Sequence, residues 1–287
     1  MFNLILRGLA TGSIYSLTAV GIVLILSTTN VMNFAQGDTG MFLTYIAFFF
    51  ILRGIAPSLT LPIVIAVGAV LGYLVYKGLI SKAKKSSHLG MMIITLGLTM
   101  IFEGTVATFF GNIPLLFPPL IPGDPVHFGS VILDRQDILC LVTALVVFAI
   151  LSFILYRTKV GIAARSIADD QYAARVLGIP IDRIHSLIWA ISFGLAGLAG
   201  VMTAPRLSLQ PLFMVVVQLK AFTAAVLGGM NSVTGAIWGG LILGVMENLV
   251  AYYVPAIKES FSLLLIVAIL LFLPNGLFGS RGAGRSS

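Results

Sequence analysis

Residues 4–53 read LILRGLATGSIYSLTAVGIVLILSTTNVMNFAQGDTGMFLTYIAFFFILR, which is two long apolar runs separated by a short polar break. The first run, over 4–28, is longer than the roughly 20 apolar residues that a helix needs to cross the hydrocarbon core of a bilayer. The break, STTNVMNFAQGDTG, occupies 27–40, and the second run covers 36–53. Because a helix satisfies its own backbone hydrogen bonds in lipid, this pattern predicts membrane helices with an interruption between them.

The rest of the chain continues this pattern. Its 287 residues are 59% hydrophobic and 9% charged, with a mean hydropathy of +1.07, which leaves too little polar surface for a soluble globule. The runs lack the alternation over about ten residues that a membrane barrel strand shows. We therefore expect an all-α polytopic membrane bundle of about 8–10 helices, one or two of them broken, in a single domain over 1–287. The nine predicted spans are 4–28, 36–53, 60–80, 90–110, 137–156, 184–204, 213–229, 233–253 and 260–274.

Basic residues, which give the chain a net charge of +7, gather in three clusters between these spans. Two spans separate the first cluster from the second and four separate the second from the third, so all three fall on one side, the cytoplasm by the positive-inside rule. This favours membrane orientation over nucleic-acid binding, with a cytoplasmic C-terminus and an external N-terminus. A half-span hidden in 31–53 would reverse the N-terminus. The clusters are Lys77, Lys82, Lys84 and Lys85; Arg157, Lys159, Arg165, Arg175 and Arg183; and Arg281 and Arg285.

Residues 111–136 hold five prolines and too little apolar continuity to span, which predicts an ordered external loop with a short strand near 127–133. A second polar break, APRLSLQP, interrupts the helices near 190–228. Interrupted segments in both halves of a membrane protein point to a transport pathway. The second break can equally be an ordinary loop between helices.

A cytoplasmic loop over about 157–183, which begins RTKVGIAARSIADDQYAARVLGIP, holds the second basic cluster and three acidic residues. Within it, 169–178 predicts a short helix, with Asp169 as N-cap, Asp170 at the positive end of the helix dipole, and Gly178 in a left-handed conformation at the end. Pro180 prevents continuation. A helix of about eight residues is marginal in water, so something must pack on it.

The composition of this short helix suits docking. Ala173 and Ala174 allow close approach, and Tyr172, Val176 and Leu177 form an apolar flank. One interpretation is a helix that fits a cytoplasmic partner and transmits its motion to the spans. The alternative is a loop helix that lies on the bilayer or on its own bundle.

Neither an ATPase nor a catalytic site is evident in the sequence. The chain has no G-x-x-x-x-G-K-[ST] phosphate loop, so an ATPase must be a separate subunit. The three histidines (His88, His127, His185) are scattered, Cys140 is alone in an apolar run, and no metal-ligand spacing occurs. We expect a transport subunit without catalytic residues, without a metal site and without a cofactor of its own.

Polar residues within the apolar runs are the candidates for a solute pathway, because ionisable groups in membrane spans are costly and commonly functional. At NFAQGD, Gly37 and Asp38 suit the start of a half-helix whose amide end can face a carboxylate; the alternative is a cap at a water-exposed turn. Glu103 and Glu247 lie inside spans, where they either line a hydrated path or form hydrogen bonds between helices. The candidates are Asn33, Gln36, Gly37, Asp38, Glu103, Glu247 and Asn248.

Glycine and alanine residues four apart predict smooth helix faces for close packing. The pairs are Gly8 and Gly12, Ala196 and Gly200, Gly235 and Gly239, and Gly240 and Gly244.

Three blocks together resemble the membrane permeases of branched-chain amino acid ABC importers, in particular the smaller of their two related permease subunits. They are NFAQGD at 33–38; the pattern from Gly161 through Arg165, Ala168, Asp170 and Ala174 to 177–179; and KAFTAAVLGGMNSVTGAIWGGLILGVMEN at 220–248. The ending PNGLFG at 274–279 is a weaker fourth. Gln36 and Asp38 stand where the family commonly has His and Glu.

This resemblance implies an assembly in the bacterial inner membrane of two permeases, two cytoplasmic ATP-binding subunits that hold ATP and Mg, and a periplasmic substrate-binding protein. The second permease is either a homologue or a copy of this chain. The cargo would be branched-chain or other hydrophobic amino acids; urea, short amides or another small solute is the alternative, as is a self-contained secondary transporter using Asp38, Glu103 and Glu247. The implied ATPase-coupling residues are Arg165, Asp169, Asp170, Ala173, Ala174, Arg175, Leu177 and Gly178.

Overall fold

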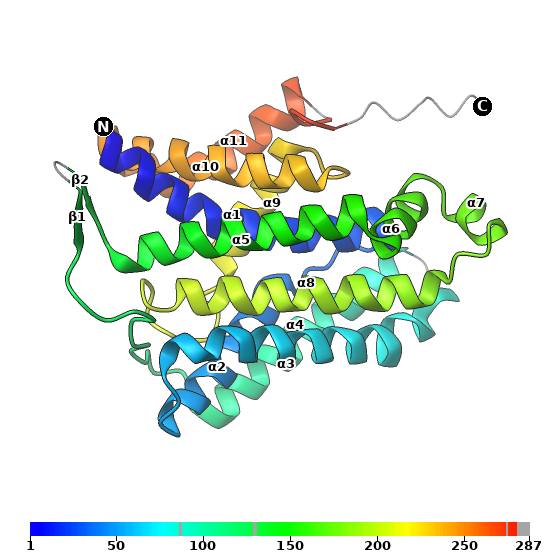
Figure 1. Ribbon diagram of the computed structural model, residues 1–287, viewed down its shortest axis with the longest axis horizontal. Coiled ribbons are helices and arrows are strands. Elements are labelled where there is room, and N and C mark those ends of the chain that lie inside the picture. The colour runs from blue at the N-terminus through cyan, green and yellow to red at the C-terminus, as the bar shows by residue number, and fades with distance from the viewer. Residues whose placement is uncertain (86–87, 129–130, 274, 280–287) are drawn as a thin grey trace.

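The computed structural model describes residues 1–85, 88–128, 131–273 and 275–279. Over these residues the chain is a bundle of helices with one small hairpin (Figure 1). The longer helices are α1 (Phe2–Thr29), α2 (Gln36–Leu52), α3 (Thr60–Val75), α4 (His88–Phe110), α5 (Arg135–Arg157), α6 (Lys159–Asp169), α8 (Ile181–Thr203), α9 (Val215–Gly228), α10 (Val233–Tyr253) and α11 (Lys258–Phe272). The shorter elements are α7 (Gln171–Val176), the turns η1 (Pro57–Leu59), η2 (Tyr76–Ile80), η3 (Lys82–Lys85) and η4 (Pro255–Ile257), and the antiparallel strands β1 (Val126–Phe128) and β2 (Val131–Leu133).

Seven helical segments in the described part are long and apolar enough to cross a membrane, which confirms a polytopic all-α membrane protein. They contain α1, α3, α4, α5, α8, α10 and α11. The other two predicted spans correspond to α2 and α9, which have 17 and 14 residues. At 1.5 Å per residue both are shorter than the roughly 30 Å hydrocarbon core. Helix α2 begins inside the first polar break and α9 begins shortly after the second, so both short helices are linked to the breaks.

Helices α1 and α8 form the centre of the bundle, and most of the residues in both are buried. Helix α1 packs along α10, and α3 packs along α8. The α1–α10 contact depends on glycine, because a Cβ built on Gly244 would lie 2.3 Å from the Cα of Gly12. A Cβ on Gly240 would meet the Ser16 backbone at 2.6 Å. The prediction that these glycines serve close packing is therefore confirmed.

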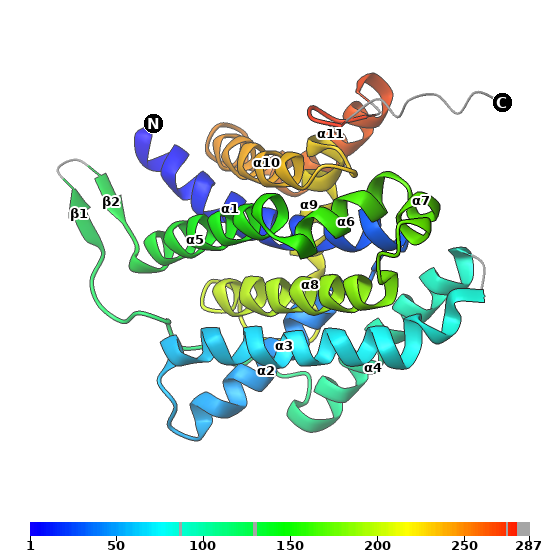
Figure 2. The same ribbon diagram turned by 45° about the vertical axis from the view of Figure 1, so that its right-hand side comes forward.

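The two ends of the bundle differ in what they carry. One end holds the N-terminus, the segment after α4 and the β1–β2 hairpin; the opposite end holds α6, α7 and the turns η2 and η3 (Figures 1 and 2). In place of the one short strand predicted near 127–133 there are two, β1 and β2, while 129–130 lie outside the described residues. The first two basic clusters lie at the same end, as predicted, and the third lies outside the described residues. Which end faces the cytoplasm stays a prediction, and we call the N-terminal end the outer end on that basis.

The loop at 157–183 differs in detail from the prediction. Residues 159–169 form α6, whose first turn is capped by Thr158 accepting from Gly161 N at 3.2 Å. Asp169 therefore ends α6, and the N-cap of the next helix is Asp170, which accepts from Tyr172 N at 2.8 Å and from Ala173 N at 3.0 Å. Helix α7 has six residues and not eight. Gly178 has φ +78°, so its predicted left-handed conformation is confirmed.

Candidate functional site

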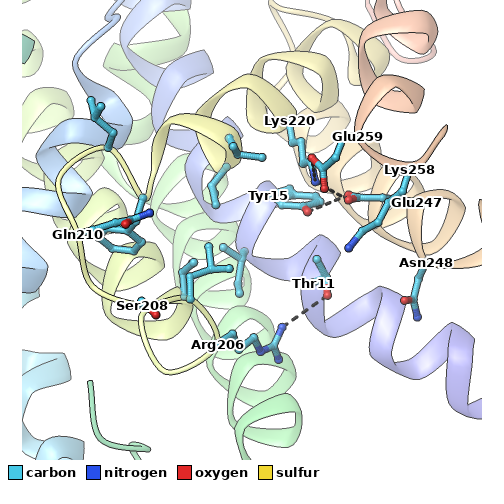
Figure 3. Close-up of a pocket in the computed structure, with 18 of the residues that line it drawn as sticks. Thr11, Tyr15, Arg206, Ser208, Gln210, Lys220, Glu247, Asn248, Lys258 and Glu259 are labelled. Atoms are coloured by element: carbon cyan, nitrogen blue, oxygen red, sulfur yellow. Dashed lines mark hydrogen bonds and ion pairs between the residues drawn. The ribbon is translucent and has the colours of Figure 1, made fainter. Parts of the chain in front are cut away.

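A cavity of about 670 Å³ opens between α1, α9, α10, the start of α11 and the segment that follows α8 (Figure 3). Its volume falls within the range of about 300–1,000 Å³ that small-molecule sites occupy. Pro114, from the segment after α4, also lines it, which places the cavity toward the outer end. Five charged side chains share this lining: Arg206, Lys220, Glu247, Lys258 and Glu259.

The floor of the cavity is a buried ion pair between α9 and α10. The Lys220 ammonium donates to Glu247 Oε1, and the Tyr15 hydroxyl of α1 donates to Glu247 Oε2 at 2.8 Å. The side chains of Lys220 and Glu247 are only 8% and 5% exposed. A buried charge is tolerated only when it is paired and hydrogen-bonded, and here both carboxylate oxygens have a donor. These contacts hold three helices in one arrangement.

Arg206 follows α8 and forms one side of the cavity. Its guanidinium donates to Asp137 of α5 and makes a longer contact, 3.5 Å, with the Thr11 hydroxyl of α1. The Arg206 side chain remains 26% exposed. Because a guanidinium has five N–H donors in a planar fork, these contacts leave donors for a further acceptor.

The first turn of α11 forms the opposite side. Glu259 is 70% exposed on its side chain, and its Oε2 lies 3.9 Å from Lys220 Nζ. Figure 3 shows Lys258 and Glu259 coming from α11, with Lys258 extended toward Thr11, the residue that Arg206 approaches from the other direction. Lys258 and Arg206 thus approach Thr11 from two directions, while the exposed Glu259 carboxylate lies next to Lys220, away from Thr11.

Of the pathway candidates from the sequence, Glu247 and Asn248 line this cavity. Asn248 is fixed by donating to Leu4 O at 2.6 Å. Lys220, Arg206 and Tyr15 were not among the candidates. Lys220 carries a signal that could have identified it, since it is an ionisable residue inside the predicted span 213–229.

The NFAQGD candidates lie elsewhere, in a buried network between α1, α2, α8 and α9. Asn33 Nδ2 donates to Gln36 Oε1 at 3.0 Å, and Gln36 Nε2 donates to Ser192 O at 3.0 Å. The Gly37 amide donates to Gln218 Oε1 of α9. Asn33, Gln36 and Asp38 are all buried, so a water-exposed turn is the wrong interpretation.

Helix α2 does begin within this motif, but a side chain of the protein already accepts from its Gly37 amide. The amide end is therefore not open to a solute carboxylate in this structure. Glu103 lies on α4, partly exposed and outside the cavity lining. The seven candidates thus do not form one site: Glu247 and Asn248 line the cavity, whereas the NFAQGD residues lie on the side of the bundle where α2 packs against α4, the helix of Glu103.

At the opposite end, α7 exposes apolar side chains. Tyr172, Val176 and Leu177 are 77%, 72% and 78% exposed, although they are large and apolar. Ala174 faces the other way and is buried, so it seats α7 on the protein and cannot meet a partner directly. Ala173 and Arg175 are exposed beside the apolar side chains. On the neighbouring α6, the Arg165 guanidinium lies 4.9 Å from the ring centre of Tyr156.

Comparison with known proteins places this arrangement in a family. The family described as the permease component of branched-chain amino acid transport systems matches residues 4–273. The chain is 32% identical to the high-affinity branched-chain amino acid transport system permease protein LivH of Escherichia coli K12, over 97% of this chain and 94% of that protein. It is 31% identical to the corresponding protein BraD of Pseudomonas aeruginosa, over 96% and 94%.

A more distant match is the ribose import permease protein RbsC of Escherichia coli K12, at 27% identity over 82% of this chain and 74% of that protein. The two permeases named for branched-chain amino acids match more of the chain at higher identity. This chain belongs to the family of branched-chain amino acid transport system permease components.

Proposed function

We propose that this chain is the membrane permease of an ATP-driven importer for branched-chain or other hydrophobic amino acids, and that separate ATP-binding subunits dock on α7. Family membership supports the importer, and the names of the relatives support the cargo. The observation that carries the docking role is the exposed apolar surface of α7, formed by Tyr172, Val176 and Leu177. We call it the α7 surface.

The α7 surface is held firmly enough to transmit force. Asp170 caps the start of the helix, Ala174 is packed inward, and Gly178 turns the chain directly into α8. Helix α8 is central to the bundle. A push on α7 would therefore reach the core of the permease through one short connection, which suits a coupling element.

The remaining partners follow from the same proposal. A second permease, a homologue or a second copy, would complete the membrane assembly, and a binding protein would deliver the amino acid at the outer end. ATP and Mg would bind to the ATPase subunits, since this chain lacks a phosphate loop. A secondary transporter is less well supported, because Glu247, one of the three carboxylates that could form its ion-coupling site, is already paired with Lys220.

The Leu177→Asp variant tests the docking role. Burying a leucine side chain contributes about 1.5–3 kcal/mol, so replacing it with a charge should weaken ATPase binding by about tenfold or more. We expect the ATP-binding subunits to be lost from the purified complex and uptake to fall, while the amount of protein in the membrane stays unchanged, because the side chain is exposed.

Leu116→Asp is the matched control, since Leu116 is also strongly exposed but lies in the segment after α4 at the outer end. It should leave ATPase co-purification unchanged. Normal co-purification with Leu177→Asp would contradict the proposal. Solute uptake by the chain alone in liposomes, driven by an ion gradient, would replace it with a secondary transporter.

A further inference from the structure

We infer that the outer cavity is a binding site for a zwitterionic aliphatic amino acid, with Arg206 and Lys258 receiving the carboxylate and Glu259 receiving the ammonium. This inference rests on the proposed function for its cargo, and it assigns that cargo a place in this chain. It is drawn from the charge balance, the free donors and acceptors, and the apolar wall of the cavity.

The charge balance of the cavity suits a solute without net charge. Its lining carries three basic side chains and two acidic ones, and Asp137, paired with Arg206 behind the lining, makes the third acid. A site with equal numbers of both signs gains nothing from a net cation or anion. It favours a molecule that carries one charge of each sign.

The groups already paired differ from those that remain available. Lys220 and Glu247 are buried and satisfy each other with Tyr15, so they form the fixed floor. The Arg206 side chain is partly exposed and that of Glu259 is exposed, and among the described residues the ion-pair contact found for Glu259 is the 3.9 Å one to Lys220. Lys258 and Glu259 are neighbours in the first turn of α11, so a carboxylate held by Arg206 and Lys258 would leave the ammonium of the same molecule facing the Glu259 side of the cavity (Figure 3).

The rest of the lining is apolar. Ile14 of α1, Val217 of α9 and Phe213 just before α9 provide a wall of hydrocarbon next to the charged groups. A cavity with one charged side and one apolar side fits an amino acid with an aliphatic side chain better than it fits a sugar or urea, which carry polar groups all round.

The test measures equilibrium binding of radiolabelled L-leucine to the full chain, purified in lipid nanodiscs without ATPase subunits. L-leucinamide, which lacks the carboxylate charge, and N-acetyl-L-leucine, which lacks the ammonium charge, serve as competitors. We expect saturable leucine binding and about tenfold or weaker competition by both analogues, since a hydrogen bond to a charged group contributes about 1.5–3 kcal/mol.

Two variants separate the roles. Glu259→Gln should weaken leucine binding by about tenfold and remove the discrimination against N-acetyl-L-leucine while keeping that against L-leucinamide. Lys258→Gln should reduce the discrimination against L-leucinamide, because only Arg206 then receives the carboxylate, and should keep the discrimination against N-acetyl-L-leucine. Both residues are exposed, so the variants should fold. Asp124→Asn, an exposed acid in the segment after α4, is the control and should bind as the unmodified chain does.

Absence of saturable leucine binding at millimolar concentrations would overturn the inference, as would equal affinity for leucine and its two analogues. An unchanged competition pattern in both Glu259→Gln and Lys258→Gln would also overturn it. The assay contains no ATPase subunits, so a negative result concerns leucine binding alone. If ATPase docking on α7 is wrong, leucine binding in this assay should still be observed.

Discussion

The outer cavity and the α7 surface depart from ordinary protein architecture in opposite ways. In the cavity, charged side chains lie inside a membrane bundle, but Lys220, Glu247 and Tyr15 satisfy one another. On the α7 surface, apolar side chains lie outside, and nothing in the described part of the chain covers them. The cavity floor is thus complete within one chain, whereas the α7 surface is complete only with a partner. Changes to the floor should damage the fold, and changes to the α7 surface should damage only assembly.

The largest effect is expected from Lys220→Met, which removes one partner of the buried ion pair. It leaves Glu247 as an uncompensated buried charge, which costs about 3–5 kcal/mol in the free energy of unfolding. Denaturant unfolding of the purified chain in detergent measures this loss. The double variant with Glu247→Leu should recover most of it, because an apolar pair of similar volume is then buried. If Lys220→Met is as stable as the unmodified chain, the Lys220–Glu247 ion pair does not stabilise the fold.

A smaller but more selective effect is expected at Gly178, which joins the α7 surface to α8. Proline cannot adopt its φ of +78°, so Gly178→Pro should displace α7 and abolish ATPase co-purification and uptake. Membrane insertion should persist, since no neighbouring atom would contact a Cβ at this position. Gly178→Ala is a milder variant. Alanine in this left-handed conformation costs about 1–2 kcal/mol of strain, so ATPase co-purification and uptake should be lost only in part. Full uptake with Gly178→Pro would contradict a role for α7 in coupling ATP hydrolysis to transport.

The smallest effect is expected from Asp170→Ala, which removes the cap of α7. The cost should be about 1 kcal/mol and local. Hydrogen exchange should therefore quicken at the amides of Tyr172 and Ala173, which donate to the Asp170 carboxylate. Asp169→Ala is the matched control and should leave both rates unchanged. If exchange at these amides is faster in Asp169→Ala and not in Asp170→Ala, the N-cap of α7 is Asp169, as the sequence analysis predicted.

The sequence predicted the apolar helices well because their signal is local and long. It did not predict α6, a helix of 11 residues in which only Gly161, Ala164 and Ile167 are buried. With two adjacent aspartates, the cap of α7 depends on where α6 ends, and the sequence did not show that. Gly178 was predictable, since few residues other than glycine suit the turn after a short helix.

The cavity was harder to predict, because its pairs join residues far apart in the chain. Glu247 was a candidate on its own, but its partners Lys220 and Tyr15 come from α9 and α1. Arg206 and Asp137 are similarly brought together by α8 and α5. The sequence alone identifies a charged residue within a membrane span. The packing of the helices is needed to show which residue of opposite charge pairs with it.

The most direct test of the whole account is ATP-driven leucine uptake by the assembled complex in liposomes, compared between Leu177→Asp and Glu259→Gln, with leucine binding and ATPase co-purification measured on the same preparations. Uptake should fall in both variants, for different reasons. Leu177→Asp should retain leucine binding and lose the ATPase, and Glu259→Gln should retain the ATPase and bind leucine weakly. Normal uptake in Leu177→Asp, or loss of both properties in a single variant, would contradict the separation of an outer binding site from an inner docking surface.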